Sequence, residues 1–268
     1  MKSRGTADKD KVEQRIGYWF ASQSETSALT AEHSLTFGRR IKNLNDKPPW
    51  MIVDKQIESL IVTASQWPGS LWRARIVKQG DMSGLIANPS YWRACEIEII
   101  EELPIGVLFG PYGEGIPPLL SQITTLTLSE VDKLHVNMAE NSDAEAAWVR
   151  AWNFWNENLE YPRQHKYDCD EGMTLASPGN HDHEMSPVNR GFSLISDLIW
   201  QRARKVEGQN AFIEFIEYGE VELKLSPRWN AACKAFLQAA MALSMSQYLS
   251  TMETIALTRA WSSVFQPK

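Results

Sequence analysis

Apolar and polar residues alternate at 71–78 and again at 95–99, with the period of two that half-buried strands show. Trp72, Ala74 and Ile76 recur at every second position, so we expect them on the buried face of one strand. The intervening Arg73 and Arg75 then face solvent or acidic neighbours. Turn sequences divide the rest of this region, and the pattern predicts an antiparallel β-meander. The predicted strands cover 71–78, 82–87, 95–99, 105–109 and 123–128.

Arginines on this predicted sheet stand beside aromatic residues, a combination that also occurs on strand surfaces that bind single-stranded nucleic acid. Four glutamates lie close to these arginines in the sequence. They would repel phosphate, but they could pair with the arginines across neighbouring strands. We therefore expect structural cross-strand pairs, with nucleic-acid binding as the alternative. The residues concerned are Arg73, Arg75, Arg93, Trp72, Tyr91 and Trp92, with Glu96, Glu98, Glu101 and Glu102.

A glycine-rich sequence at 110–115 follows one of the predicted strands and superficially matches a phosphate-binding loop. Such a loop needs a helix immediately after it, so that unpaired amides point at the phosphate. The sequence Ile116-Pro117-Pro118 predicts extended backbone instead, so we expect a tight surface loop.

Spacings of three and four residues between apolar positions predict helices, most of them in the second half of the chain. Ser226 as N-cap and Pro227 as first helical residue open a run without internal glycine or proline to about Phe265. This run predicts one long helix, or two with a bend. The other predicted helices cover 12–23, 129–134, 143–159 and 192–204.

The order of these elements predicts an α+β fold, an antiparallel β-meander followed by a predominantly helical C-terminal half. A doubly wound parallel sheet is the alternative. Residues 211–225 add a strand or a hairpin around Tyr218-Gly219-Glu220, with a helix as the alternative. We expect a helix plus antiparallel-sheet region at 1–128 and a mainly helical region at 129–268, as two domains or as one continuous domain.

Three tryptophans, Trp148, Trp152 and Trp155, recur at helical spacing and therefore lie on one face of the predicted helix 143–159. An apolar face of this kind is usually covered by the core. If it is exposed, it anchors a protein partner, because aromatic residues are common among interface hot spots. We expect core packing, and these three residues are the candidate partner-binding residues.

Composition and charge narrow the class of protein. The formal net charge of the 268 residues is −6, so a broad phosphate-neutralising surface is not expected and nucleic acid is not the expected partner. The three cysteines are odd in number and widely separated, which predicts a reducing, cytoplasmic location and no disulfide framework. We expect no secretory signal and no membrane association, since no apolar run is long and unbroken enough.

Histidines are concentrated in one polar segment, from His165 to Glu184, which the composition predicts to be a long loop. Imidazole and thiolate are the ligands that zinc prefers, so His165, Cys169, His181 and His183 are candidate metal ligands. Their spacing matches no established zinc motif. We therefore expect no cofactor, with zinc at these four residues as the alternative.

These patterns predict a non-enzymatic cytosolic protein that binds another protein, since the charge is acidic, tryptophan is plentiful and catalytic motifs are missing from the sequence. The expected partner is a basic protein, and an inhibitor or immunity-type protein that neutralises a bacterial toxin is one specific version. The alternative is a metal-dependent hydrolase with His181 or His183 as ligand or general base. Asp182 or Glu184 would then orient that histidine. The sequence leaves the oligomeric state open.

Overall fold

A computed structural model of the chain describes residues 15–25, 37–42, 48–80, 88, 90–110, 112–158, 187–217 and 220–266, apart from the side chains at 142, 154–158, 187–189 and 217. The chain divides into two compact units. The sheet unit comprises Met1–Leu60 and Leu71–Leu103, and the helical unit comprises Ile61–Ser70 and Pro104–Lys268. The boundary between these two compact units therefore falls after Leu103. Whether the chain also divides at 128/129 into two independently folding domains stays a prediction.

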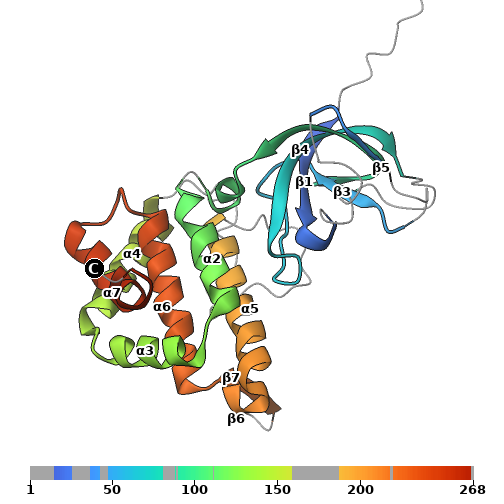
Figure 1. The fold of residues 1–268 in the computed structure, drawn as a ribbon. Helices are drawn as coiled ribbons and strands as arrows, with labels where there is room; N and C mark the ends of the chain where they lie inside the picture. The colour runs from blue at the N-terminus through green and yellow to red at the C-terminus, as the bar shows by residue number, and fades with distance from the viewer. Residues whose placement is uncertain are drawn as a thin grey trace, which may run out of the picture. The chain divides into compact units, whose positions relative to one another are not determined.

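The sheet unit is built on a five-stranded sheet with antiparallel pairings (Figure 1). Its strands are β1 (Ile16–Ser22), β2 (Arg40–Lys42), β3 (Met51–Asp54), β4 (Gly69–Gln79) and β5 (Tyr91–Leu103). They follow the order β2-β5-β3-β1-β4, and β4 also pairs with β5, so the sheet closes on itself. The long strand β5 makes this closure possible: β3 and then β2 pair along one edge, and β4 runs along the other.

The inner face of this sheet carries the core of the unit. In β4, Trp72 and Ala74 are 5% and 0% exposed, and Ile76 packs half-buried against the same core. The predicted inward face of this strand is therefore confirmed. The buried residues of this core are Trp19, Ala21, Ile41, Val53, Trp72, Ala74, Ala94, Ile97 and Ile99.

The opposite face of β4 carries the predicted arginines, and each lies beside an acidic residue of β5. Arg73 is directly opposite Glu101 and the two form an ion pair of 3.2 Å. Arg75 is directly opposite Glu98, with 3.4 Å between the charged groups. The predicted cross-strand pairing of arginine and glutamate is confirmed at both positions.

Strand β1 lies where the sequence predicts a helix over 12–23, so that prediction is wrong at Ile16–Ser22. Gly17, Trp19 and Ala21 are buried, whereas Tyr18 and Phe20 between them are half-buried, which is the alternation of a strand. Over so short a run the apolar positions fit both periods. Gly17 then decides in favour of pairing, because a Cβ there would lie 2.2 Å from the carbonyl oxygen of Asp54 in β3.

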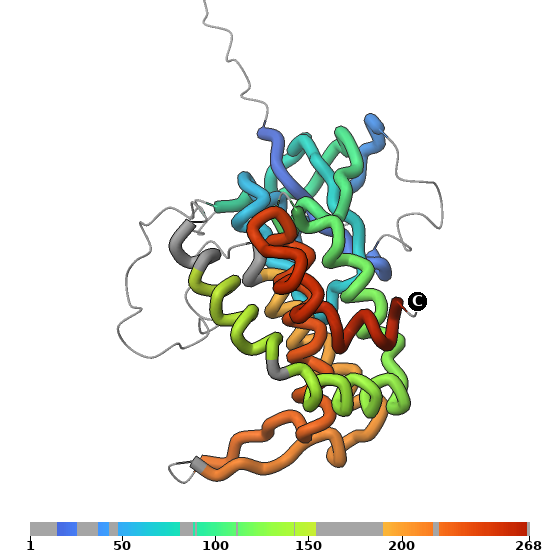
Figure 2. The backbone as a smooth tube through the Cα atoms, turned by 90° about the vertical axis from the view of Figure 1, so that its left-hand side faces the viewer, coloured from blue at the N-terminus to red at the C-terminus, as the bar shows by residue number. Residues whose placement is uncertain are grey.

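The helical unit is dominated by helices, so the α+β fold is confirmed (Figures 1 and 2). Its elements include η1 (Ile105–Phe109), η2 (Gly113–Gly115), α2 (Ile116–Thr125), α3 (Leu128–Ala139), α4 (Ser142–Asn158), α5 (Pro187–Glu207), η4 (Gly208–Ala211), α6 (Pro227–Ser244) and α7 (Thr251–Phe265). Helix α6 is central and packs against α2, α3, α4, α5 and α7. Its buried alanines, among them Ala235, Ala239 and Ala240, let these neighbours approach closely.

Three local predictions in this unit need correction. The strand predicted at 105–109 is the short 3-10 helix η1, and most of the one predicted at 123–128 belongs to the end of α2 and the start of α3. Extended backbone at 116–118 is also wrong, because α2 begins at Ile116 with Pro117 and Pro118 in its first turn. Proline is tolerated there because the first amides of a helix have no intrahelical partner.

The C-terminal run forms two helices, α6 and α7, which is one of the two predicted versions. A capping box begins α7: Ser250 Oγ accepts from the amide of Glu253, and the Glu253 carboxylate accepts from the amide of Ser250. Across the described ranges, every helix falls short of the length and apolarity that crossing a bilayer requires.

Candidate functional site

A two-stranded hairpin, β6 (Phe212–Glu217) and β7 (Glu220–Leu225), extends from the helices of the helical unit (Figure 2). It confirms the hairpin predicted within 211–225. The strands pair in register, from Phe212 opposite Leu225 to Glu217 opposite Glu220. Within the described residues no third strand joins this sheet, so each strand keeps one edge without a strand partner. A lone hairpin is marginally stable in water, so its base has to hold it.

Aromatic packing fixes the base of the hairpin. Phe212, the first residue of β6, is 8% exposed, and its ring lies 4.7 Å from that of Trp200 in α5. The guanidinium of Arg204 lies over the Phe212 ring at 5.6 Å, a cation–π contact. The amide of Ser226 donates to the carbonyl oxygen of Ala211 at 2.8 Å, which joins the two chain segments just before the strands begin.

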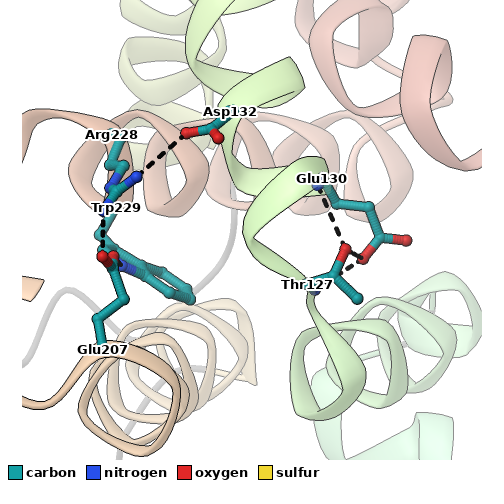
Figure 3. A network of polar contacts seen from close by, with 6 residues as sticks. All are labelled: Thr127, Glu130, Asp132, Glu207, Arg228 and Trp229. Carbon is teal, nitrogen blue, oxygen red and sulfur yellow. Dashed lines mark hydrogen bonds and ion pairs between the residues drawn. The ribbon is translucent and has the colours of Figure 1, made fainter.

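Polar contacts tie the helices that flank the hairpin in sequence (Figure 3). Glu207, the last residue of α5, accepts a hydrogen bond from Trp229 Nε1 at 2.5 Å and a charge-assisted one from Arg228. Arg228 also pairs with Asp132 of α3 at 3.4 Å. The Glu207 carboxylate is largely buried and Trp229 is fully buried, so these bonds connect α5, α6 and α3 where the hairpin leaves them.

Apolar side chains on the outer part of the hairpin are exposed. Ile216 and Val221 lie directly opposite each other beside the turn, 69% and 62% exposed. Leu223 is also exposed on their face, while Ile213 and Phe215 are exposed on the other face. Adjoining exposed apolar side chains of this kind mark interaction surfaces.

Acidic residues accompany these apolar side chains. The hairpin contains Glu214, Glu217, Glu220 and Glu222 and a single cation, Lys224. Lys224 is already engaged, since it lies 3.3 Å from Glu222 and 3.6 Å above the ring of Phe215. Among the described residues, no cation forms an ion pair with Glu214 or Glu220. The hairpin therefore offers an exposed surface that is both apolar and acidic.

The tryptophan stripe lies elsewhere, on α4. Trp148 and Trp152 stack at 6.0 Å, and Phe192 of α5 lies 5.7 Å from the first ring and 6.2 Å from the second. All three rings are half-buried and pack against a core cluster that includes Met241. The side chain of Trp155 lies outside the described residues, and partner binding by the stripe stays a prediction.

The predicted metal ligands His165, Cys169, His181 and His183 all lie outside the described residues, as does the rest of the segment 159–186. Zinc binding and the hydrolase alternative therefore stay predictions. In the part of the chain that the structure does describe, no three or more His, Cys, Asp or Glu residues gather in a way that would hold a metal ion.

Two described cysteines, Cys95 and Cys233, are buried, and Cys233 is a free thiol. Burial raises the pKa of the Cys233 thiol to about 11, although a hydrogen bond with Ser196 lowers it in part. A thiol with this pKa stays protonated near neutral pH and is a poor nucleophile. Cys233 is therefore a packing residue of α6.

Comparison of the chain with protein-family models, with curated proteins and with solved structures finds no match. What the chain does has to be inferred from its own surface. The sequence predicts the hairpin but not its role as a site. The available signal was that Ile213, Phe215 and Ile216 place apolar side chains on both faces of a short strand pair.

Proposed function

We propose that the protein binds another protein, a basic one, through the β6–β7 hairpin. The observation that carries this proposal is the pair Ile216 and Val221, directly opposite each other and largely exposed on an element whose base is held firmly. Apolar surface in water has a free-energy cost. A partner that covers it gains roughly 25 cal/mol for each Å² of apolar area buried.

The glutamates make this surface negatively charged. Glu214, Glu220 and Glu222 surround the apolar residues, and the one lysine is already paired within β7. A surface of this charge attracts cationic partners and accelerates their association at low salt. The net charge of the whole chain, −6, has the same sign, so the long-range field and the local surface favour the same class of partner.

A non-enzymatic inhibitor or immunity-type protein that neutralises a bacterial toxin is the narrower form of the proposal. Such a protein needs a firmly held, charge-complementary surface and no reacting group. The anchoring of Phe212 and the acidic residues beyond it support this form. We propose that the binding takes place in the cytoplasm, because the three cysteines are odd in number and widely separated and Cys233 is a free thiol, the form that a reducing compartment maintains.

The test compares the wild-type chain with the double variant Ile216→Ser and Val221→Ser. Each protein is immobilised and exposed to a lysate of the native host, and a protein retained by the wild type is purified so that its dissociation constant can be measured. We expect the double variant to bind it at least about tenfold more weakly. We also expect association by the wild type to slow between about 0.05 M and about 0.3 M salt.

The matched control replaces two exposed valines outside the hairpin, Val136→Ser on α3 and Val149→Ser on α4, which are 55% and 48% exposed. This control removes similar apolar surface and should bind the partner as the wild type does. Equal binding by the hairpin variant and the control would show that the hairpin is not the interface.

A further inference from the structure

We infer that the basic partner binds as an added β-strand along the outer edge of β6; this inference rests on the proposed function and specifies its geometry. Strand addition uses main-chain hydrogen bonds for affinity and alternate side chains for specificity. It requires an edge without a strand partner, backbone groups that point outward, and side chains beside them that fit the incoming strand.

The register identifies the backbone groups that point outward. In an antiparallel pair, hydrogen-bonded and non-hydrogen-bonded residue pairs alternate. Ala211 and Ser226 are bonded through the Ser226 amide at 2.8 Å. Counting from there along the register, residues 213 and 215 bond to β7, whereas the amides and carbonyls of Phe212, Glu214 and Ile216 point away from it. The two outermost of these, at Glu214 and Ile216, lie in the exposed part of the strand.

Two observations favour the edge of β6 over that of β7. Strand β7 leads directly into α6 through Ser226 and packs against that helix, whereas Figure 2 shows β6 on the side of the hairpin away from the helices. In addition, β7 carries Lys224, and lysine on an edge strand opposes the approach of another strand, above all a basic one. Strand β6 carries no cation.

The two faces of the hairpin define the chemistry of the incoming strand. Residues directly opposite each other share a face, so Ile216, Val221 and Leu223 lie on one face with Glu214. The other face carries Glu220 and Glu222 together with Ile213 and Phe215, and its one cation, Lys224, is already paired with Glu222 and lies over the Phe215 ring. Successive side chains of a strand point to opposite faces. The segment that fits is therefore extended, with aliphatic residues alternating with lysine or arginine.

The test uses a fluorescein-labelled octapeptide of alternating lysine and valine, with binding to the full chain measured by fluorescence anisotropy. The decisive variants are Ile216→Pro and Val221→Pro. Both remove an exposed β-branched side chain from the same residue pair, and both remove an outward-pointing amide that the ladder does not use. They differ only in the edge they block. We expect Ile216→Pro to weaken binding about tenfold or more and Val221→Pro to change it less than about threefold.

Hydrogen–deuterium exchange gives an independent readout, because the added strand should slow exchange of the amides of Glu214 and Ile216. Far-ultraviolet circular dichroism should show both proline variants folded as the wild type is. A peptide with glutamate in place of lysine should not bind. A peptide N-methylated at alternate valines should bind weakly, since it lacks the amides that pair with β6.

Other outcomes overturn the inference in distinguishable ways. If both proline variants bind the peptide equally well while the double serine variant does not, the hairpin binds by side chains alone and only the strand-addition mode falls. If the peptide fails to bind while the host partner still depends on Ile216 and Val221, the deduced strand chemistry is wrong and the proposed function stands. If sedimentation shows a dimer that Ile216→Pro abolishes, the edge pairs with a second copy and the basic partner is wrong.

Discussion

The five-stranded sheet and the β6–β7 hairpin are both antiparallel, but they treat their edges in opposite ways. In the sheet unit, β5 pairs on both sides and the sheet closes on itself, so among the described strands only the short β2 keeps an edge without a strand partner. In the hairpin, each strand has one edge without a strand partner in the described chain. An unpaired edge is a site for pairing with another chain, and folded proteins usually protect it.

The charges differ in the same way. Three of the four glutamates on β5 are matched with cations across the sheet: Glu101 with Arg73, Glu98 with Arg75, and Glu96 with both Arg40 and Lys42. On the hairpin, Glu214 and Glu220 form no ion pair within the described residues. The closed sheet therefore pairs most of the glutamates of β5 within the fold, whereas the hairpin leaves Glu214 and Glu220 for an external partner.

The largest expected effect is a difference in the free energy of unfolding between a variant in the sheet core and a variant on the hairpin. Trp72→Ala empties part of the closed-sheet core, where the side chain is 5% exposed, and should lower the free energy of unfolding by about 3–5 kcal/mol. Ile216→Ala on the hairpin removes a side chain that is 69% exposed and should change it by less than about 0.5 kcal/mol. Chemical denaturation followed by tryptophan fluorescence and circular dichroism measures both. A large loss for Ile216→Ala would mean that the hairpin tip is part of the fold and not reserved for a partner.

The next largest effect compares the stability contributed by the base of the hairpin with that contributed by its outer part. Phe212→Ala removes a ring that packs on Trp200 and carries Arg204 above it, so we expect the free energy of unfolding to fall by about 3 kcal/mol. Phe215→Ala, in the same strand and 41% exposed, is the matched control and should cost less than about 1 kcal/mol. Thermal unfolding curves of the two variants test this. Equal losses would remove the distinction between a fixed base and an exposed tip.

The strands that sequence predicted correctly are those in which one period dominates over enough residues. In β4, Trp72, Ala74 and Ile76 alternate with charged residues, and a helical period does not fit them. In β1 the run is too short to separate the two periods, and its strand state depends on the close approach of β3 at Gly17, a tertiary contact. The prediction at the start of α2 was wrong for a different reason: a pair of prolines is compatible both with extended backbone and with the first turn of a helix.

The candidate site was harder to predict because exposure is not a local property. Val221 alternates with glutamates as a residue of a half-buried strand would, and Ile216 follows another apolar residue, Phe215. The sequence does not say whether another element covers them. Only the position of the helices around the base shows that they are left exposed. The sites predicted from the sequence, by contrast, were chosen by residue type, as clusters of tryptophan and of histidine. The tryptophans of α4 lie half-buried against the core, and the histidine segment lies outside the described residues.

A glutamate that the fold itself uses provides the third test, to set against the unpaired glutamates of the hairpin. Hydrogen bonds from Ser250 and from Arg150 lower the pKa of Glu253 from its ordinary 4.5 to about 2. Because the folded-state pKa lies below the unfolded one, the stability this group contributes is present above about pH 4.5 and is lost as the pH falls towards 2. Ser250→Ala should cost about 1 kcal/mol at neutral pH through loss of the cap, and should reduce the loss on acidification.

The control for this pH dependence is Glu214→Gln, which neutralises a hairpin glutamate. We expect it to leave both the stability and its change between pH 5 and pH 2 close to the wild type, because surface substitutions usually have effects within about 0.5 kcal/mol. Denaturation at a series of pH values measures the two variants together. A marked effect of Glu214→Gln would contradict the idea that the hairpin acids have no role in the fold.

The smallest effect compares one ion pair from each region by double-mutant cycles. In the closed sheet, Arg75 and Glu98 are directly opposite each other on neighbouring strands, and both are partly shielded from solvent. Cross-strand opposite charges contribute about 0.2–1 kcal/mol, so the cycle of Arg75→Ala and Glu98→Ala should give a coupling of about 0.5 kcal/mol. In the hairpin, Glu222 and Lys224 lie on the same strand, with their side chains 63% and 41% exposed. Water and salt screen such a pair, and we expect its coupling to be near zero. A coupling energy in the hairpin as large as that in the sheet would mean that the hairpin charges stabilise the fold. The difference between the sheet and the hairpin would then rest on the exposed apolar residues of the hairpin alone.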